Sequence, residues 1–202
     1  MLKNVKRSLD KIAKSLEASH QAREYLIKNT RDVVILCSQS IIAVHKGDLK
    51  LARKNVLMAK KLLAKYKKSA KGDLVRYLVT PEQEIVEAAS LISIVEGKPI
   101  PSVESVGVSD ESYILGLLDC IGELKRLIYD KIRMEKTSES VRFFEIMENL
   151  YLILYPFATY DKIVKETRKK LDVNRILVEE TRSALTEEIR RAKLIDAINK
   201  IK

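Results

Sequence analysis

Four carboxylates lie in two apolar stretches, where an acidic side chain is costly. Glu84 and Glu87 are three residues apart in the run EIVEAASLI, and Asp119 and Glu123 are four residues apart in the run ILGLLDCIGEL. Residues three or four apart share one face of a helix, so each pair would present two carboxylates in one direction. No basic residue stands three or four positions from Asp119. A buried carboxylate without a partner either destabilises the fold strongly or takes up a proton and becomes uncharged.

A divalent cation would relieve that cost. Four converging carboxylates offer only hard oxygen ligands, which favour Mg²⁺, or Mn²⁺ in its place, over Zn²⁺. Gly116 and Gly122 flank Asp119 and would let another backbone or a phosphate approach closely. The alternative is that a Lys or Arg from another helix pairs with each acid, and Glu84, near a helix start, could have a capping or surface role. Composition and spacing leave both interpretations open.

The net charge changes sign between two neighbouring parts of the chain. Residues 46–76 carry 11 basic and 2 acidic side chains, net +9, whereas residues 81–123 carry 1 basic and 9 acidic side chains, net −8. A basic block suits a polyanion such as nucleic acid. The acidic block would repel that polyanion unless it held cations.

Lysines of the basic block could contact phosphate groups, largely without regard to nucleotide sequence. The six residues are Lys60, Lys61, Lys65, Lys67, Lys68 and Lys71. Their alternative role is a solvated lysine-rich face. Arg126 follows Glu123 by three residues, so it could neutralise a substrate phosphate or pair with one of the acids. His20 and His45 are too few and too far apart for a zinc site, and we interpret both as structural.

The spacing of apolar residues predicts an all-α fold, organised as one helical domain over residues 1–202. We expect a long N-terminal helix over about 3–46, a basic helix over about 48–67, a short helix over 73–79, two acidic helices over about 81–96 and 110–136, and C-terminal helices within 139–198, divided into 139–155, 160–171 and 173–197. Asp48 and Ser109 would cap two of these helices, and Thr80 with Gln83 would form a capping box for a third.

Composition excludes several classes of protein. The chain has only 6 Gly and 4 Pro in 202 residues, which argues against a turn-rich β protein. No window is apolar and long enough to span a membrane, and the N-terminal residues lack the apolar core of a secretion signal. Cys37 and Cys120 are far apart and lie in apolar surroundings, so we expect a reduced, cytoplasmic protein. An apolar stripe from Leu2 to Leu16 suits contact with another subunit.

Four segments resemble the translin family, and in particular its branch of translin-associated factor X (TRAX). Residues 82–88 (EQEIVEA) are similar to the QEYVEA segment of that branch, and residues 107–127 (GVSDESYILGLLDCIGELKRL) are similar to its DYLLGVADLTGELMRL segment. Residues 45–48 resemble the first helix junction of the family, and residues 172–182 resemble its C-terminal helix. The resemblance therefore extends over nearly the whole chain.

The resemblance implies an all-α, seven-helix subunit that assembles into a hollow octamer. It also implies a Mg²⁺-dependent endoribonuclease, because in TRAX two Glu on one helix and an Asp and a Glu on the next form the metal site. By motif these acids correspond to Glu84, Glu87, Asp119 and Glu123, and all four are present. The translin subunit, by contrast, binds RNA and single-stranded DNA and lacks most of these acids.

Three hypotheses follow from the sequence. The first is a metal-dependent ribonuclease in a homo-oligomeric cage, which the complete set of four acids favours. The second is a non-catalytic, translin-like protein that binds RNA or single-stranded DNA. The third is a helical scaffold that binds no nucleic acid, which the basic block disfavours.

Overall fold

The computed structural model describes residues 2–201, and in this range all regular structure is helical. Seven α-helices occur in it, so the all-α, seven-helix prediction is confirmed. They are α1 (Lys3–His45), α2 (Leu49–Lys67), α3 (Val79–Val95), the single turn α4 (Val103–Val106), α5 (Asp110–Arg133), α6 (Thr137–Leu154) and α7 (Thr167–Asn199), with two 3₁₀ helices, η1 (Gly72–Leu78) and η2 (Tyr155–Tyr160). None of the described helices is both long and apolar enough to cross a membrane.

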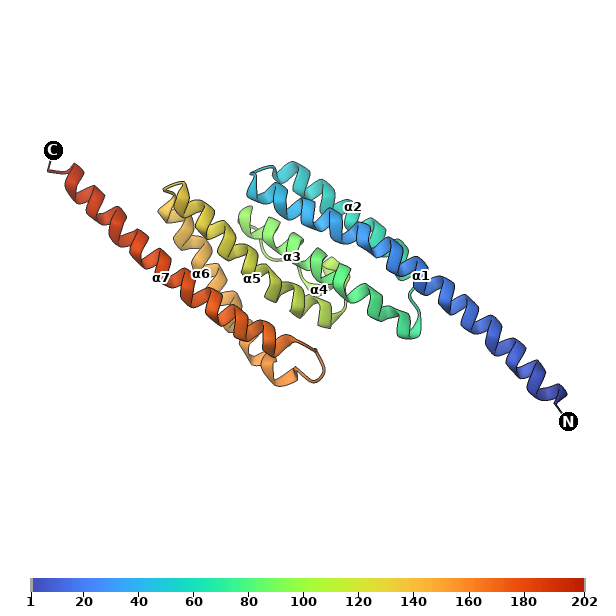
Figure 1. Cartoon of the computed structure of the whole chain (residues 1–202). Coiled ribbons are helices and arrows are strands. Elements are labelled where there is room, and N and C mark those ends of the chain that lie inside the picture. Colours follow the sequence, from blue (N-terminus) through green and yellow to red (C-terminus); the bar gives the residue numbers. More distant parts are fainter. Residues whose placement is uncertain (1, 202) are drawn as a thin grey trace.

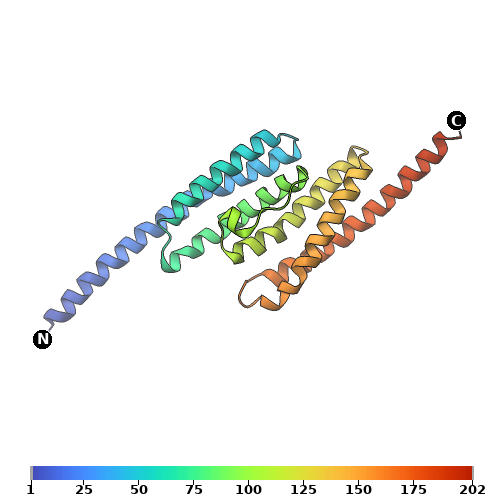
Figure 2. The same cartoon turned by 180° about the vertical axis from the view of Figure 1, so that it is seen from behind.

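Helices α3 and α5 pack against each other at the centre of the bundle (Figure 1). Helices α1 and α2 lie on one side of this pair, and α6 and α7 lie on the other. Seen from behind, α2, α4 and α6 lie in front, and the two termini extend away from the bundle in opposite directions (Figure 2). The central pair therefore has α1 and α7 as its neighbours on the side that Figure 1 presents.

Helix α1 consists of a buried half and an exposed arm. Its C-terminal half buries Leu26, Val33, Cys37 and Val44, which recur at the spacing of one helix face. Almost every residue before Leu26 is exposed, and the predicted stripe from Leu2 to Leu16 has no partner within the described chain. The arm therefore presents apolar surface that this subunit does not cover.

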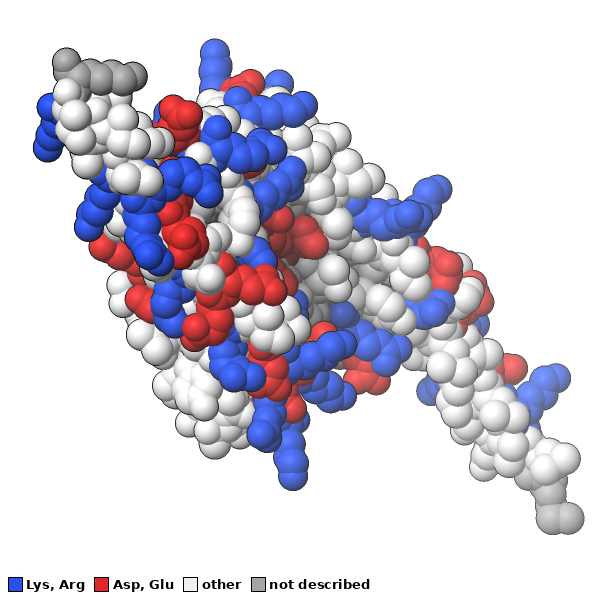
Figure 3. Space-filling view, turned by 60° about the vertical axis from the view of Figure 1, so that its left-hand side comes forward, with Lys and Arg blue, Asp and Glu red and all other residues white. Residues whose placement is uncertain are grey.

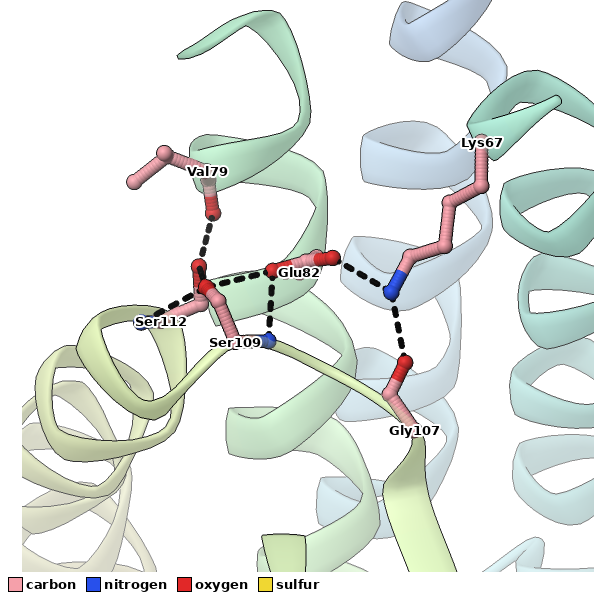
Figure 4. Close-up of polar contacts among 6 residues, drawn as sticks. All are labelled: Lys67, Val79, Glu82, Gly107, Ser109 and Ser112. Carbon is pink, nitrogen blue, oxygen red and sulfur yellow. Dashed lines mark hydrogen bonds and ion pairs between the residues drawn. The ribbon is translucent and has the colours of Figure 1, made fainter. Parts of the chain in front are cut away.

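A closed polar network fixes the start of α5 against α2 and α3 (Figure 4). Glu82 of α3 is 4% exposed, and its Oε2 accepts hydrogen bonds from the Ser109 backbone N–H at 2.9 Å and from the Ser109 hydroxyl at 2.8 Å. Its Oε1 pairs with Lys67 Nζ at 2.6 Å, and Lys67 also donates to the carbonyl of Gly107 at 2.6 Å. Ser109 caps α5 as predicted, because its hydroxyl accepts from the Ser112 N–H.

The pKa of Glu82 shows that this network favours the carboxylate. Burial alone would raise the pKa, but the hydrogen bonds from Lys67 and Ser109 outweigh burial and hold it below its usual value. Every carboxylate oxygen of Glu82 therefore has a partner inside the protein.

Gly116 lets the two central helices approach closely. A Cβ placed on Gly116 would lie 2.5 Å from the Gln83 carbonyl oxygen and 2.7 Å from Val86 Cβ, too close for any residue with a side chain. This contact accounts for one of the two glycines beside Asp119, and the neighbour that Gly116 admits is the α3 backbone. Gly122 has no atom within 4 Å of the corresponding position.

Several predicted boundaries differ from the observed ones. Thr80 does not cap α3, because η1 runs directly into that helix and Leu78 occupies the N-cap position. The expected loop before Ser109 contains α4, capped by Ser102, and α5 ends at Arg133 rather than near residue 136.

The C-terminal region was also predicted incorrectly. The sequence indicated separate helices over 160–171 and 173–197, but α7 is continuous from Thr167 to Asn199. No Gly or Pro interrupts this range, so the chain has no residue that would end the helix. Residues 160–166 instead close η2 and turn the chain, with Glu166 at a positive φ of 73°.

Candidate metal centre

The structure brings the four predicted acids close enough between α3 and α5 for the charges of Asp119 and Glu123 to act on Glu84 and Glu87. Glu84 and Glu87 come from α3, and Asp119 and Glu123 come from α5; all four side chains are partly buried. The tight contact at Gly116 holds the two helices together beside these residues. Helical spacing predicted one pair of acids on each helix, and the packing of α3 against α5 places the two pairs side by side.

The four carboxylates repel one another electrostatically. Burial, followed by the negative charges of Glu84, Asp119 and Glu123, raises the pKa of Glu87 to about 8. Burial also raises the pKa of Glu84, with Asp119 as the next cause. A carboxylate with a raised pKa is one whose charged form lacks compensation. The site therefore carries more negative charge than its surroundings neutralise.

Two cationic side chains border the acids, Lys170 of α7 and Arg126 of α5. Lys170 of α7 forms a direct ion pair with Asp119, and it lowers the pKa of Glu84 and Glu87 in opposition to burial and the acids. Arg126 lies 3.8 Å from Glu123, in a contact that its exposure weakens. The alternative that a basic residue from another helix pairs with one of the acids is therefore realised for Asp119.

His45 lies at the end of α1, between two carboxylates of α5. Its side chain is 5% exposed, and its Nε2 is hydrogen-bonded to Glu123 Oε2 at 2.7 Å. Its Nδ1 lies 3.3 Å from Asp130 Oδ2 but outside hydrogen-bond geometry. His45 therefore orients the Glu123 carboxylate. The sequence led us to interpret His45 as structural, and the structure places it directly beside the acids.

Glu84 and Glu87 have no hydrogen bond or ion pair at their carboxylates within residues 2–201. Their oxygens, together with those of Asp119 and Glu123, form a hard, negatively charged donor set that fits Mg²⁺ or Mn²⁺ chemically. In the described part of the chain, no three His, Cys, Asp or Glu side chains are already in the geometry of a metal site. Binding would therefore require side-chain rotation and, at Asp119, exchange of the Lys170 contact.

Two buried thiols lie close to the acids but do not add soft ligands. Burial, followed by the charges of Glu84 and Glu87, raises the pKa of the Cys37 thiol, and burial with the nearby acids raises that of Cys120. Both thiols therefore stay protonated, as expected for buried small hydrophobic residues.

A pocket of about 330 Å³ opens directly beside Asp119. Its walls include Asp119 and Gly122 of α5 and Lys169, Lys170 and Asn174 of α7. Asn174 is buried and donates to the Leu118 carbonyl at 2.9 Å, which ties α7 to α5 at this point. The pocket places two lysines next to the acid cluster, in a position that could receive an anionic group.

The structure separates the predicted phosphate-binding lysines into different positions. Lys61 and Lys65 on α2 and Lys68 at its C-cap form an exposed stripe, while Lys71 is exposed in the connection to η1. Lys60 is half-buried, and Lys67 is held by Glu82. Over the face shown in Figure 3, basic and acidic side chains are interspersed.

Sequence reasoning missed Lys170 and Asp130 as neighbours of the acids. Lys170 is 51 residues from Asp119 in the chain, so helical spacing could not connect them. One available signal was the cost of an unpaired Asp in an apolar helix, which predicted that some cation must approach it. His45 offered a second signal, since it is the first residue of the segment 45–48 that resembles the helix junction of the family.

Fold and site together define an all-helical bundle with a carboxylate cluster between its two central helices. The model of the Translin family matches residues 74–182, which contain all four acids. The chain is also 34% identical over 182 residues to uncharacterized protein MJ0175 of Methanocaldococcus jannaschii, covering 89% of this chain and 82% of that protein. The chain therefore belongs to the translin family.

Solved structures agree with this assignment. The structure of AfC3PO in complex with duplex RNA has a TM-score of 0.83 and 29% identity, and it covers 93% of this chain and 98% of its own. The crystal structure of AfC3PO alone has a TM-score of 0.83 and 31% identity, with coverages of 93% and 99%. Apo-NeC3PO, at 20% identity, shares the fold with a TM-score of 0.77 and coverages of 93% and 98%.

Proposed function

We propose that this protein is a Mg²⁺-dependent endoribonuclease of the TRAX type that acts within an oligomeric helical cage. The observation that carries the proposal is the juxtaposition of Glu84, Glu87, Asp119 and Glu123, with Glu84 and Glu87 left without partners. The resemblance of these motifs to TRAX and the similarity to AfC3PO support it.

Each residue of the site has a distinct role in this proposal. The four carboxylates would hold one or two Mg²⁺ ions, which supply Lewis-acid activation of water and of the phosphate. One of the two Glu of α3 would accept the proton of the attacking water, since burial and the neighbouring acids raise the pKa of both, and that of Glu87 to about 8, in the range of an effective base. His45 would keep Glu123 oriented, and Arg126 would contact a substrate phosphate.

The substrate in this proposal is RNA. The relative AfC3PO has been solved with duplex RNA, which favours RNA over a small phosphate ester. The exposed stripe of Lys61, Lys65 and Lys68, with Lys71 beyond it, would contribute sequence-independent phosphate contacts. Lys67 and Lys60 would contribute less, because one is engaged by Glu82 and the other is half-buried.

Assembly would use the exposed arm of α1. Leu2, Val5, Leu9, Ile12 and Leu16 are each at least half exposed and alternate at spacings of three and four residues. This is the pattern of a helix that packs along another helix. We propose a homo-octamer in the cytoplasm, where the two free cysteines would remain reduced.

A second candidate function is supported by the Lys170–Asp119 ion pair. That pair satisfies one of the acids without a metal, as expected for a translin-like protein that binds RNA or single-stranded DNA without cleaving it. In this case the acid cluster would be structural.

The test is cleavage of labelled RNA, supplied single-stranded and as a duplex, with Mg²⁺, Mn²⁺ or EDTA. The proposal predicts cleavage that requires the metal and is lost in Glu123→Ala, with RNA binding retained. Binding without cleavage under every metal condition would instead support the second candidate.

A further inference from the structure

We infer that Lys170 is an exchangeable counter-ion of the acid site: its ammonium group neutralises Asp119 until a divalent cation takes that carboxylate. The inference rests on the proposed metal site and adds a residue that none of the four acids predicts. It makes Lys170 a positioning residue that sets how tightly the site binds its metal.

The negative charge around the ion pair favours exchange of Lys170 for a divalent cation. Within residues 2–201, Lys170 is the one ammonium group that acts on both Glu84 and Glu87 in addition to contacting Asp119. One positive charge thus faces a group of carboxylates that it cannot fully neutralise. A divalent cation carries twice the charge and accepts several oxygen ligands at once, so it competes favourably for Asp119.

Both side chains of the ion pair are also accessible to solvent and ions. The Lys170 side chain is 24% exposed and that of Asp119 is 31% exposed, so solvent and ions reach the contact. Ion pairs of this exposure are weak compared with fully buried ones. Separating the two side chains therefore costs little compared with the binding of a divalent ion by several carboxylates.

The ammonium group of Lys170 can move into an adjacent pocket when it leaves Asp119. Lys170 lines the pocket of about 330 Å³ beside Asp119, so its ammonium group can leave the carboxylate and stay within an open, solvent-accessible space. The neighbouring Glu166 lines the same pocket and offers an alternative negative charge. The Lys67–Glu82 pair shows the opposite arrangement, because Glu82 is buried and hydrogen-bonded on both oxygens.

The experiment is a Mn²⁺ titration of the full-length protein, with free Mn²⁺ followed by electron paramagnetic resonance. Four proteins are compared: the wild type, Lys170→Met, Lys170→Arg and Lys169→Met. Lys169→Met is the matched control, because Lys169 is the adjacent residue and lines the same pocket but is exposed. Asp119→Asn reports whether the titrated site is the acid cluster.

The inference predicts that Lys170→Met binds Mn²⁺ more tightly than the wild type by about two- to fivefold, the range expected for losing one partly exposed competing ion pair. Lys170→Arg retains the positive charge and should bind more nearly as the wild type does. Lys169→Met should change the affinity less than Lys170→Met.

Thermal unfolding gives a second measurement, independent of cleavage. Without metal, Lys170→Met should unfold at a lower temperature than the wild type, because Asp119 loses its partner. Saturating Mn²⁺ should then raise the unfolding temperature of Lys170→Met by more than that of the wild type, since the tighter site gains more from binding.

Equal or weaker Mn²⁺ binding by Lys170→Met would overturn the inference and make Lys170 a structural support of Asp119. An equal gain in Lys169→Met would also overturn it, because the effect would then come from net charge rather than from the contact. If the wild type binds no Mn²⁺ and Asp119→Asn changes nothing, the metal site itself fails, and the proposed function fails with it.

Discussion

Two lysine–carboxylate pairs connect the central helices to their neighbours, and their carboxylates differ in burial, in hydrogen bonding and in the charges around them. Lys67 and Glu82 belong to a network in which the carboxylate is 4% exposed and also accepts two hydrogen bonds from Ser109. Lys170 and Asp119 form a partly exposed pair beside further carboxylates. The pKa of Glu82 is lowered, whereas that of Glu87, on the same helix, is raised to about 8.

The comparison distinguishes a structural ion pair from the pair that we propose to be exchangeable. At Glu82 the hydrogen bonds exceed the cost of burial, so the network is complete without any further ligand. At Asp119 a single ammonium group faces an excess of negative charge, so we expect an added cation to stabilise the site. The sequence alone does not distinguish the two pairs, because in each case it shows only an acid within an otherwise apolar helix.

The largest effect on stability is expected at the closed pair. Glu82→Ala removes the acceptor for Ser109 and leaves Lys67 without its acid, so we expect the free energy of unfolding to fall by about 2–3 kcal/mol, less than for a fully buried pair because Lys67 is partly exposed. Urea denaturation at one fixed protein concentration measures this. Glu82→Gln keeps an acceptor oxygen and should lose less; equal stability of wild type and Glu82→Ala would contradict a structural role.

The next effect concerns the contact that holds the two central helices together. Gly116→Ala places a methyl group against the Gln83 carbonyl and Val86, so we expect a loss of about 1–3 kcal/mol from overpacking. Gly122→Ala is the matched control, since its Cβ would meet no atom within 4 Å. That variant should be more stable than the wild type by about 0.5–1 kcal/mol, the usual difference between Ala and Gly within a helix. Similar unfolding curves for both variants would contradict the close contact.

A smaller effect is expected where His45 orients Glu123. His45→Asn removes the 2.7 Å contact, and we expect metal-dependent cleavage to fall by about tenfold, as for residues that orient a metal ligand. Initial rates at saturating Mg²⁺ measure the change. His20→Asn, in the exposed arm of α1, is the control and should cleave like the wild type. Unchanged cleavage by His45→Asn would return His45 to a purely structural role.

The smallest effect is expected on the exposed face of α2. Replacing Lys61, Lys65 and Lys68 by Gln should weaken RNA binding by about two- to fivefold at moderate salt and reduce the dependence of affinity on salt concentration. Fluorescence anisotropy in a Glu123→Ala background separates binding from cleavage. The control replaces three exposed basic residues at the C-terminal end of α7 and at its C-cap by Gln: Arg190, Lys193 and Lys200. An equal loss in both triple variants would indicate a general charge effect.

Local sequence signals predicted much of the fold. The capping residues Asp48 and Ser109 act as expected, with Leu51 N–H donating to Asp48 at 2.9 Å. The acidic helices were also placed correctly, because their apolar spacing is regular. The cap at Thr80 was wrong, since the 3₁₀ helix η1 continues into α3 and no isolated helix start exists there. The signal of Thr80 and Gln83 is local, and a preceding helical segment overrides it.

The candidate site was predicted in part, for a physical reason. Spacing on one helix shows which carboxylates share a face, and so it identified two pairs. It contains no information on which residue of a distant helix approaches that face. Lys170 and His45 reach the acids through packing of α7 and α1, and the separation of Lys61 from Lys67 depends on which side of α2 meets α3. Only the assembled bundle provides these contacts.

The most direct test of the account compares two glutamates of the same helix, five residues apart. Mg²⁺-dependent cleavage of labelled RNA is measured for Glu87→Gln and Glu82→Gln, each corrected for its folded fraction. The account predicts that Glu87→Gln loses cleavage by at least about a hundredfold while remaining folded, and that Glu82→Gln cleaves within about twofold of the wild type despite its lower stability. Wild-type cleavage by Glu87→Gln would contradict the assignment of the acid cluster as the active site.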